Sequence, residues 1–310
     1  MTRVFTTVGV FGCLALVFGL TARAHSGFEP ESDEFGPWSE PVNLGPIVNS
    51  SANDAAPYIS RDGLSLYFHS SRNAAPTNPD IYVSRRKAID LPWEPPVNLG
   101  PIVNSGAAEA GPMLTRNGRL MVFASARTGN FDLYATQRRD THDDFAWDAP
   151  VALPAPINGP SFDVTGDFFE TPDGGLQLYF SSDRANGGGV NGLDIWVSEW
   201  RNGTWSDPQY VSELNSAFQD ARPAISKDGL EIIFASGRTG NLDLYVSRRR
   251  HIWEAWSAPE NLGPVLNTAA DDIQPALSAN DQTLYFASSR SGNFDLYAST
   301  RSRLHGHHTH

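Results

Sequence analysis

A unit of about 55 residues occurs five times in succession along this chain, and this repeat limits what the chain can fold into. Each unit opens with a tryptophan that is followed two or three residues later by a proline, and successive tryptophans are 55, 54, 58 and 51 residues apart. The five tryptophans are Trp38, Trp93, Trp147, Trp205 and Trp256. Self-similarity at a fixed period is typical of architectures in which neighbouring units cover each other's apolar faces.

Within each unit, four short segments rich in β-branched and aromatic residues alternate with Gly, Pro and Asn turns. In the first unit, residues 57–63 run into an Asp-Gly turn, residues 66–68 read Leu-Tyr-Phe, and Asp80 opens a last Asp-Ile-Tyr-Val-Ser segment. No helical periodicity stands out after the N-terminal segment. Four strands in a unit of this length match one blade of a propeller. The sequence therefore predicts an all-β, five-bladed β-propeller.

The phase of the repeat also predicts how the ring closes. The chain begins its first unit with the segment 38–44, but the fifth unit ends after the strand that starts at Asp295. The fifth blade then lacks an outer strand, and the opening segment has no blade of its own. Pairing the two hides two sheet edges at once. We therefore expect the N-terminal strand to complete the last blade of a propeller that spans residues 38–303.

The repeat motifs resemble those of a known family. Pro-x-[Ile/Leu]-Ser-x-Asp-Gly, then Tyr-Phe-x-Ser-x-Arg, then Gly-Asn-x-Asp-Leu-Tyr is similar to the WD40-like propeller repeats of TolB-like periplasmic proteins, and all five units show it. The resemblance implies a propeller fold and a periplasmic binding or scaffold role. It says almost nothing about catalysis. Five-bladed rings also occur in glycosidases of the arabinanase and invertase type and in a sugar-binding lectin, which resemble the expected architecture without a shared motif.

Charge narrows the classes of partner. The chain carries 23 basic and 35 acidic side chains, a net charge of −12. Nucleic-acid binding needs a basic footprint, and adsorption to anionic lipid needs basic residues as well, so neither partner is expected. A cation or a neutral polar ligand fits this balance better.

The N-terminal segment predicts export. Arg3 is followed by an apolar run over residues 8–20 and by Ala22-Arg23-Ala24, a pattern typical of a signal peptide that is cleaved after Ala24. The run is short for a membrane span. An alternative is lipoprotein processing before Cys13, the only cysteine. We therefore expect a signal peptide over residues 1–24, a periplasmic or secreted chain without disulfides, a flexible acidic lead-in over 25–37 and a loose His-rich tail over 304–310.

An acidic column supplies the first candidate site. Nine residues before the glycine position of each Asp-Gly turn stands one residue per unit, acidic in four of the five: Asp54, Glu109, Thr165, Asp220 and Asp272. Carboxylates converging on the axis of a ring would suit Ca²⁺ or sugar hydroxyls. The alternative is structural, because a feature present in nearly every blade can serve the blade itself by accepting loop hydrogen bonds.

Departures from the repeat supply the second candidate set, because the fold does not demand them. Two residues after the column the units carry Ala56, Gly111, Asp167, Arg222 and Gln274, and two further on stand Tyr58 and Phe169 in the first and third units. His69 occupies a position where the other units have Ala or Ser. The expected ligand-binding residues are Tyr58, His69, Phe169, Arg222 and Gln274, on the face where the innermost strands begin. Drift of one repeat after duplication is the alternative.

Two functions follow from these residues. The first is a non-catalytic, monomeric propeller that binds a glycan, a peptide, a small polar ligand or an envelope protein. The second is a carbohydrate-active enzyme of glycosidase or lyase type, with Asp54, Glu109, Asp167, Asp220 and Asp272 as candidate acid, base and charge-setting groups, and with Ca²⁺ as a possible cofactor. Crowded carboxylates raise one another's pKa, which would supply a proton donor near neutral pH.

Overall fold

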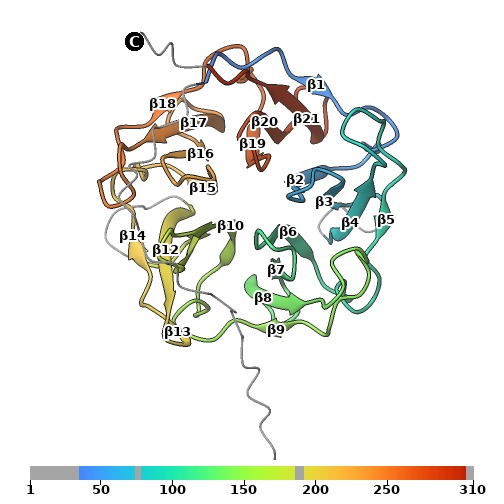
Figure 1. The fold of residues 1–310 in the computed structure, drawn as a ribbon, viewed down its shortest axis with the longest axis horizontal. Helices are drawn as coiled ribbons and strands as arrows, with labels where there is room; N and C mark the ends of the chain where they lie inside the picture. The colour runs from blue at the N-terminus through green and yellow to red at the C-terminus, as the bar shows by residue number, and fades with distance from the viewer. Residues whose placement is uncertain (1–34, 74–77, 186–191, 305–310) are drawn as a thin grey trace, which may run out of the picture.

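The computed structural model of this chain describes residues 35–73, 78–185 and 192–304. Over these residues the chain is all-β, and five sheets stand in a ring around a central axis (Figure 1). This confirms the predicted five-bladed propeller. The expected signal peptide, most of the acidic lead-in and the tail after residue 304 lie outside the described residues. Within the described ranges, no helix is long and apolar enough to cross a membrane.

Each blade has three strands of six to eight residues and an outer strand of two residues, except blade three, which has two such outer strands. Blade one is β2–β5, blade two β6–β9, blade three β10–β14, blade four β15–β18 and blade five β19–β21 with β1. The strands are β1 Val42–Asn43, β2 Asp54–Ile59, β3 Ser65–Ser70, β4 Asp80–Arg85, β5 Val97–Asn98, β6 Glu109–Leu114, β7 Leu120–Ser125, β8 Asp132–Gln137, β9 Val151–Ala152, β10 Asp163–Glu170, β11 Leu176–Ser182, β12 Asp194–Arg201, β13 Thr204–Trp205, β14 Gln209–Tyr210, β15 Asp220–Ile225, β16 Glu231–Ser236, β17 Asp243–Arg248, β18 Glu260–Asn261, β19 Asp272–Leu277, β20 Thr283–Ser288 and β21 Asp295–Thr300.

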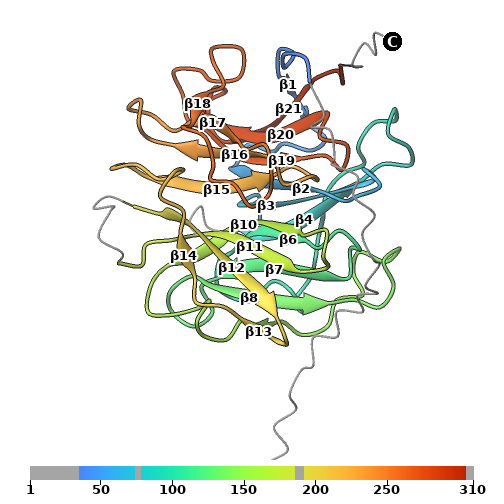
Figure 2. The same cartoon turned by 60° about the vertical axis from the view of Figure 1, so that its left-hand side comes forward.

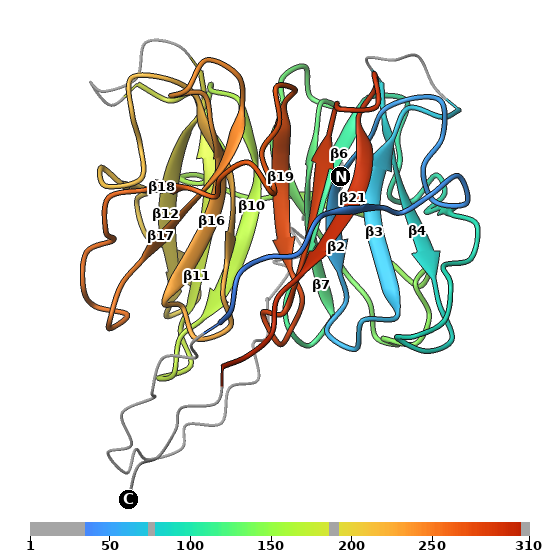
Figure 3. The same cartoon turned by 90° about the horizontal axis from the view of Figure 1, so that it is seen from above.

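The ring closes as the repeat phase predicts. β1 pairs antiparallel with β21, with Val42 opposite Ala298 and Asn43 opposite Tyr297. In Figure 3 the blue segment near the start of the chain, which carries β1, crosses the red strand β21 near the end of the chain. The outer edge of blade five is therefore covered by the start of the chain.

Neighbouring blades pack face to face, as Figure 2 shows for the sheets of blades four and five. The second strand of every blade contributes one phenylalanine with no exposed surface: Phe68, Phe123, Phe180, Phe234 and Phe286. Removing an aromatic side chain from such a core costs about 3–5 kcal/mol. The apolar core thus lies between the blades, where each sheet covers its neighbour.

A side-chain amide in the loop before each blade fixes the third strand of the preceding blade. Asn49 accepts a hydrogen bond from the Leu296 amide at 2.8 Å and donates to the Leu296 carbonyl at 3.1 Å. The same double contact is made by Asn104 to Ile81, Asn158 to Leu133, Asn215 to Ile195 and Asn267 to Leu244. Each asparagine therefore extends the pairing of a two-residue outer strand and gives the strand amide an acceptor, while the carbonyl of the same residue also accepts a backbone amide.

The repeat tryptophans pack under arginines. Arg138 lies over the Trp147 ring at 4.5 Å and Arg301 over the Trp38 ring at 4.3 Å, and Arg86 and Arg249 lie in the same way over Trp93 and Trp256. In blade three the partner is instead the edge of Trp200, whose ring centre is 5.2 Å from that of Trp205. Through these contacts the repeat tryptophans stabilise the outer part of each blade.

The innermost strands share a bulge near the axis. In all five blades the pairing of the first two strands shifts after the second residue of the inner strand. The residue at the bulge is in the left-handed region at Ala56 (φ 49°), Gly111 (φ 58°), Arg222 (φ 57°) and Gln274 (φ 57°). Because the bulge turns the backbone, these positions face the axis and the neighbouring blades.

Candidate functional site

The acidic column is buried and paired inside each blade. Arg72 donates to Asp54 at 2.6 Å, and the Asp54 side chain has no exposed surface. Asp54 also accepts hydrogen bonds from the backbone and hydroxyl of Ser50. The equivalent pairs are Arg127–Glu109, Arg238–Asp220 and Arg290–Asp272. These contacts favour the structural interpretation of the column.

The third blade has an acid in the column as well, which corrects the sequence alignment. We expected Thr165 there, but Asp163 is the residue opposite Ser182, and Arg184 donates to its carboxylate at 2.6 Å. β10 has eight residues where the other inner strands have six. Counting nine residues back from the turn therefore reaches Thr165, which is two residues past the start of the strand at Asp163. Asp167 consequently falls at the position of Tyr58, and Phe169 lies two residues further along.

A cavity of about 500 Å³ lies at the end of the ring where the inner strands finish, not at the end where they begin and where we expected the ligand. We call it the main cavity. It is lined by the ends of the inner strands, the turns that follow them and the loop after β8: residues 58–62, Ser65, 114–118, Arg138, 141–142, Asp144, 167–170, 225–227, 277–279 and Asp281. None of Asp54, Glu109, Asp220 and Asp272 is part of this lining.

Contacts between turns link four blades around the main cavity. The Arg116 amide donates to Glu170 at 3.1 Å, and the Arg116 guanidinium donates to the Lys227 carbonyl at 3.2 Å. The Lys227 amide in turn donates to both carboxylate oxygens of Asp281 at 3.2 Å. Acidic and basic groups therefore alternate along the cavity wall from blade two to blade five.

Two acids of this wall, Asp167 and Asp281, have strongly raised pKa values. Burial raises the pKa of the Asp167 carboxyl from 3.8 to about 7, against the lowering effect of hydrogen bonds from the Phe168 and Ile225 amides. Burial likewise raises the pKa of Asp281 to about 7. Two groups of the main cavity can therefore carry or release a proton near neutral pH, as an acid or base catalyst requires.

Aromatic side chains form part of the same wall. The Tyr58 hydroxyl donates to the Leu114 carbonyl of blade two at 2.5 Å, and burial, followed by the charge of Asp167, raises the tyrosine pKa well above 10.0. Phe169 is 2% exposed and lies so close to Gly229 that an added Cβ there would stand 2.3 Å from the ring. Tyr58 and Phe169 thus both line the main cavity, which lies at the opposite end of the ring from the expected ligand face, and Phe169 is mostly behind its surface.

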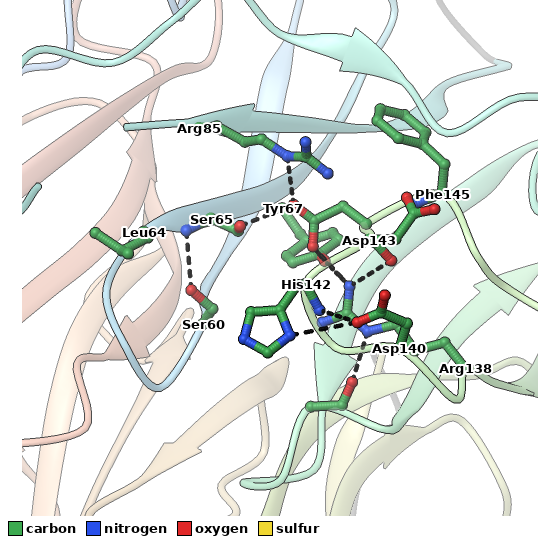
Figure 4. A network of polar contacts seen from close by, with 12 residues as sticks. Ser60, Leu64, Ser65, Tyr67, Arg85, Arg138, Asp140, His142, Asp143 and Phe145 are labelled. Carbon is green, nitrogen blue, oxygen red and sulfur yellow. Dashed lines mark hydrogen bonds and ion pairs between the residues drawn. The ribbon is translucent and has the colours of Figure 1, made fainter. Parts of the chain in front are cut away.

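A polar network closes the side of the main cavity between blades one and two. Asp144 is 4% exposed and accepts hydrogen bonds from Ser65 at 2.8 Å, Arg85 at 2.7 Å, Arg138 at 2.6 Å and the Tyr67 hydroxyl. Figure 4 shows Ser65, Tyr67 and Arg85 pointing from blade one toward the loop of blade two. Burial opposes ionisation, but these four hydrogen bonds hold the pKa of Asp144 below 3.8.

A second space, the axial cavity, has a volume of only about 20 Å³ and lies at the bulges of the inner strands. It is lined by residues 56–58, 111–112, 166–167, Arg222 and 274–276, so it shares Tyr58 and Asp167 with the main cavity. The Ala56 amide donates to Gln274 at 2.7 Å, and the Arg222 amide donates to Ser181 at 2.8 Å. The bulges are therefore tied to side chains of the preceding blade.

His69 has the same structural role in blade one. Its Nδ1 accepts a hydrogen bond from the Gly111 amide at 3.3 Å, which requires that nitrogen to be unprotonated. Burial, and then the charge of Arg222, lowers the pKa of His69 to about 3. His69 lines neither the main nor the axial cavity.

The column does not fit the proposed calcium site. Each of its carboxylates already holds an arginine and loop donors, and Ca²⁺ needs oxygens that are free to coordinate. Among the described residues, no group of three or more His, Cys, Asp or Glu side chains is placed to hold a metal ion.

Sequence reasoning missed Arg116, Lys227, Asp144 and Asp281 as parts of a site. Only Asp281 carries a signal in the repeat, because it stands where the other four turns have glycine and keeps that turn's left-handed conformation, with φ 58°. The others lie in turns and loops, whose positions relative to the axis the repeat does not reveal.

Comparison with known proteins identifies the architecture. No protein-family model and no curated protein matches this sequence. Among solved structures, the α-L-arabinofuranosidase PaAbf62A from Podospora anserina, solved in complex with cellotriose, is similar with a TM-score of 0.56 and 15% identity, covering 86% of this chain and 97% of that one. An α-L-arabinofuranosidase from Lactobacillus brevis is similar with a TM-score of 0.59 and 14% identity, covering 83% and 92%.

TolB structures also occur among the matches. TolB from Acinetobacter baumannii is similar with a TM-score of 0.49 and 18% identity, covering 82% of this chain and 56% of that one. The similarity to the two arabinofuranosidases, at 15% and 14% identity, establishes a shared propeller fold and leaves the function to the residues of the site.

Proposed function

We propose that the main cavity is a carbohydrate-binding site. The observation that carries this proposal is the composition of its wall. Carboxylates and cationic groups alternate around a space of about 500 Å³, with Tyr58 and Phe168 among the lining residues. Pockets of this size suit ligands of a few rings or fewer.

Sugars need the kind of lining that this cavity has. Each hydroxyl donates one hydrogen bond and accepts others, so a sugar is held best where acceptors such as Asp167 and Glu170 stand near donors such as Arg116. Aromatic rings provide apolar area against the C–H face of a sugar ring. The fold similarity to arabinofuranosidases supports the same ligand class, and the expected signal peptide would bring the site to the periplasm or the exterior.

Calorimetric titration of the full-length mature protein with a panel of pentoses, hexoses and short oligosaccharides tests the proposal. We expect one class of sugar to bind, and Asp167→Asn and Glu170→Gln to weaken that binding at least about tenfold, since each removes a charged hydrogen-bond acceptor. Asp207→Asn, an exposed substitution on the outer edge of blade three, is the matched control. Absence of binding across the panel, or equal binding by all three variants, would refute the site.

Cleavage of a glycosidic bond at the same site is the second candidate function, and the pKa of Asp167 favours it. A carboxyl with a pKa of about 7 is partly protonated at neutral pH and can donate a proton to a leaving oxygen. Asp281, with a pKa also raised to about 7, and Glu170 are the other carboxyls of the wall that could take part in the reaction.

Release of nitrophenol from aryl arabinofuranosides and xylosides separates the two functions. If the site is catalytic, Asp167→Asn abolishes release while sugar binding survives in part, and the rate falls as pH rises above about 7 because the acid loses its proton. Binding without any turnover by the unmodified protein would leave the binding function and exclude the enzymatic one for these substrates.

A further inference from the structure

Arg222 is a partly buried cation to which no described residue supplies a counter-charge. It lines the axial cavity, its Nη1 is buried without a hydrogen-bond partner, and it makes no ion pair with any described residue. Burial lowers the pKa of its guanidinium only to about 10, so the group stays charged at neutral pH. A guanidinium nitrogen that is enclosed without an acceptor is unfavourable, because it has lost water without gaining a partner.

The other buried arginines show how this fold normally treats a guanidinium. The five arginines of the acidic column each hold a carboxylate, and Arg138 holds Asp144. Arg301 pairs with Glu231 at 2.7 Å, and Arg249 and Arg301 both donate through Nε to a backbone carbonyl and lie over a tryptophan ring. The Arg222 side chain has none of these contacts among the described residues.

The immediate surroundings of Arg222 offer little negative charge. His69 is held neutral by its contact with Gly111, and the Gln274 carbonyl oxygen is occupied by the Ala56 amide. The remaining polar group of Gln274 is its NH₂, which is a donor. Asp167 is the one acid of the axial cavity lining, and it accepts hydrogen bonds from Phe168 and Ile225 and also borders the main cavity.

The backbone position does not account for the arginine. Its φ of 57° lies in the left-handed region, as do those of Ala56, Gly111 and Gln274 at the same bulge of other blades. The bulge therefore accepts small and polar residues, and the fold does not require a cation there.

We propose that the axial cavity binds a single halide-sized anion, held by the guanidinium of Arg222 with the Gln274 amide as a second donor. The volume of about 20 Å³ admits one small ion or one water and no polyatomic ligand. A water molecule would supply hydrogen-bond acceptors without compensating the charge, so the anion is the better occupant. The proposal concerns the axis alone and does not depend on the sugar site.

Bromide is the probe that tests it. Crystals of the full-length mature protein soaked in sodium bromide should show an anomalous difference peak on the axis within hydrogen-bonding distance of Arg222 Nη1. In solution, bromide at about five times its Kd should raise the melting temperature by roughly 2–4 °C over sodium gluconate of equal ionic strength.

The variant Arg222→Met should lose the bromide response, because it removes the cationic group among the residues that line the axial cavity. Arg201→Met, at an arginine whose side chain is 59% exposed, is the matched control and should keep the response. A crystal without the axial peak, or an Arg222→Met protein that still responds to bromide, overturns the proposal. A peak without stabilisation in solution means binding at crystal concentration only and overturns it too.

Discussion

Arg72 and Asp54 form an ion pair of 2.6 Å inside blade one, between the start of β2 and the loop after β3. Arg72 also donates to the Val48 carbonyl, in the segment that enters from blade five, so one guanidinium ties the inner strand to the incoming chain. The repetition of this pair in every blade explains why the acids recur with the repeat. They belong to the architecture of the blade.

Replacing one of these acids should therefore lower stability and leave ligand binding intact. Asp220→Asn leaves Arg238 without its charged partner in a site where the acid has no exposed surface, which should reduce the free energy of unfolding by about 3 kcal/mol. Urea denaturation followed by tryptophan fluorescence measures this. Asp207→Asn is the control. A variant of unchanged stability that had lost sugar binding or turnover would restore the catalytic interpretation of the column.

The raised pKa of Asp167 predicts a specific dependence of stability on pH. The unfolded carboxyl titrates near 3.8 and the folded one near 7, so between these values the folded protein holds more protons than the unfolded chain. Stability contributed by this group is therefore full at low pH, falls as pH rises through this window and levels off above it. Asp167→Asn lacks this loss, and its stability relative to the unmodified protein should rise from pH 4 to pH 7. Parallel melting curves at all pH values would contradict the assignment.

The network at Asp144 predicts coupling between blades one and two. A double-mutant cycle of Tyr67→Phe with Asp144→Asn should give an interaction energy of roughly 1–3 kcal/mol, because the hydroxyl and the carboxylate are in direct contact. Tyr285→Phe paired with Asp144→Asn should be additive, since Tyr285 lies in blade five. Additivity in the first cycle would mean that this contact does not hold the blades together.

The two hydrogen bonds between the Asn49 side chain and the Leu296 backbone, which we call the clamp, predict that the Asn49 side-chain amide contributes strongly to ring closure. Asn49→Ala leaves the Leu296 amide without its acceptor, at a cost of about 1–3 kcal/mol, whereas the Leu296 carbonyl keeps its bond from the Leu44 amide. The equivalent substitution Asn267→Ala affects an internal pair of blades and should cost a similar amount without opening the ring. Limited proteolysis should then cut only the Asn49→Ala protein near its N-terminal segment. Equal resistance of both variants would show that closure does not depend on the clamp.

The fold could be predicted from the sequence because the repeat is strong. The tryptophan spacing fixes the number of blades, and the spare segment at residues 38–44 identifies the closing strand, which pairs as expected through Val42 and Asn43. The acids of the column could also be found, since they recur at a constant distance from the turn. Their pairing with the equally periodic arginines could have been inferred from the same spacing.

The site was harder to predict for a physical reason. A lengthened β10 shifted the third repeat by two residues, so Asp167 and Phe169 were assigned to the wrong positions in the blade although both line the main cavity. The cavity itself depends on which turns reach over the axis, and Arg116 and Lys227 do so through contacts between blades. Sequence periodicity describes one blade at a time, and it contains no information on such contacts.

The pairing of β1 with β21 has a consequence for how the molecule is made. Val42 and Ala298 are among the most distant partners in the chain, so the first strand must wait for nearly the whole polypeptide before it finds its place. Contacts of such long sequence separation form late and slowly, and four finished blades with a bare edge are prone to associate with one another. A newly synthesised molecule is therefore most prone to aggregate just before its last blade is complete. Chaperones or conditions that cover the bare sheet edge should raise the yield of folded protein.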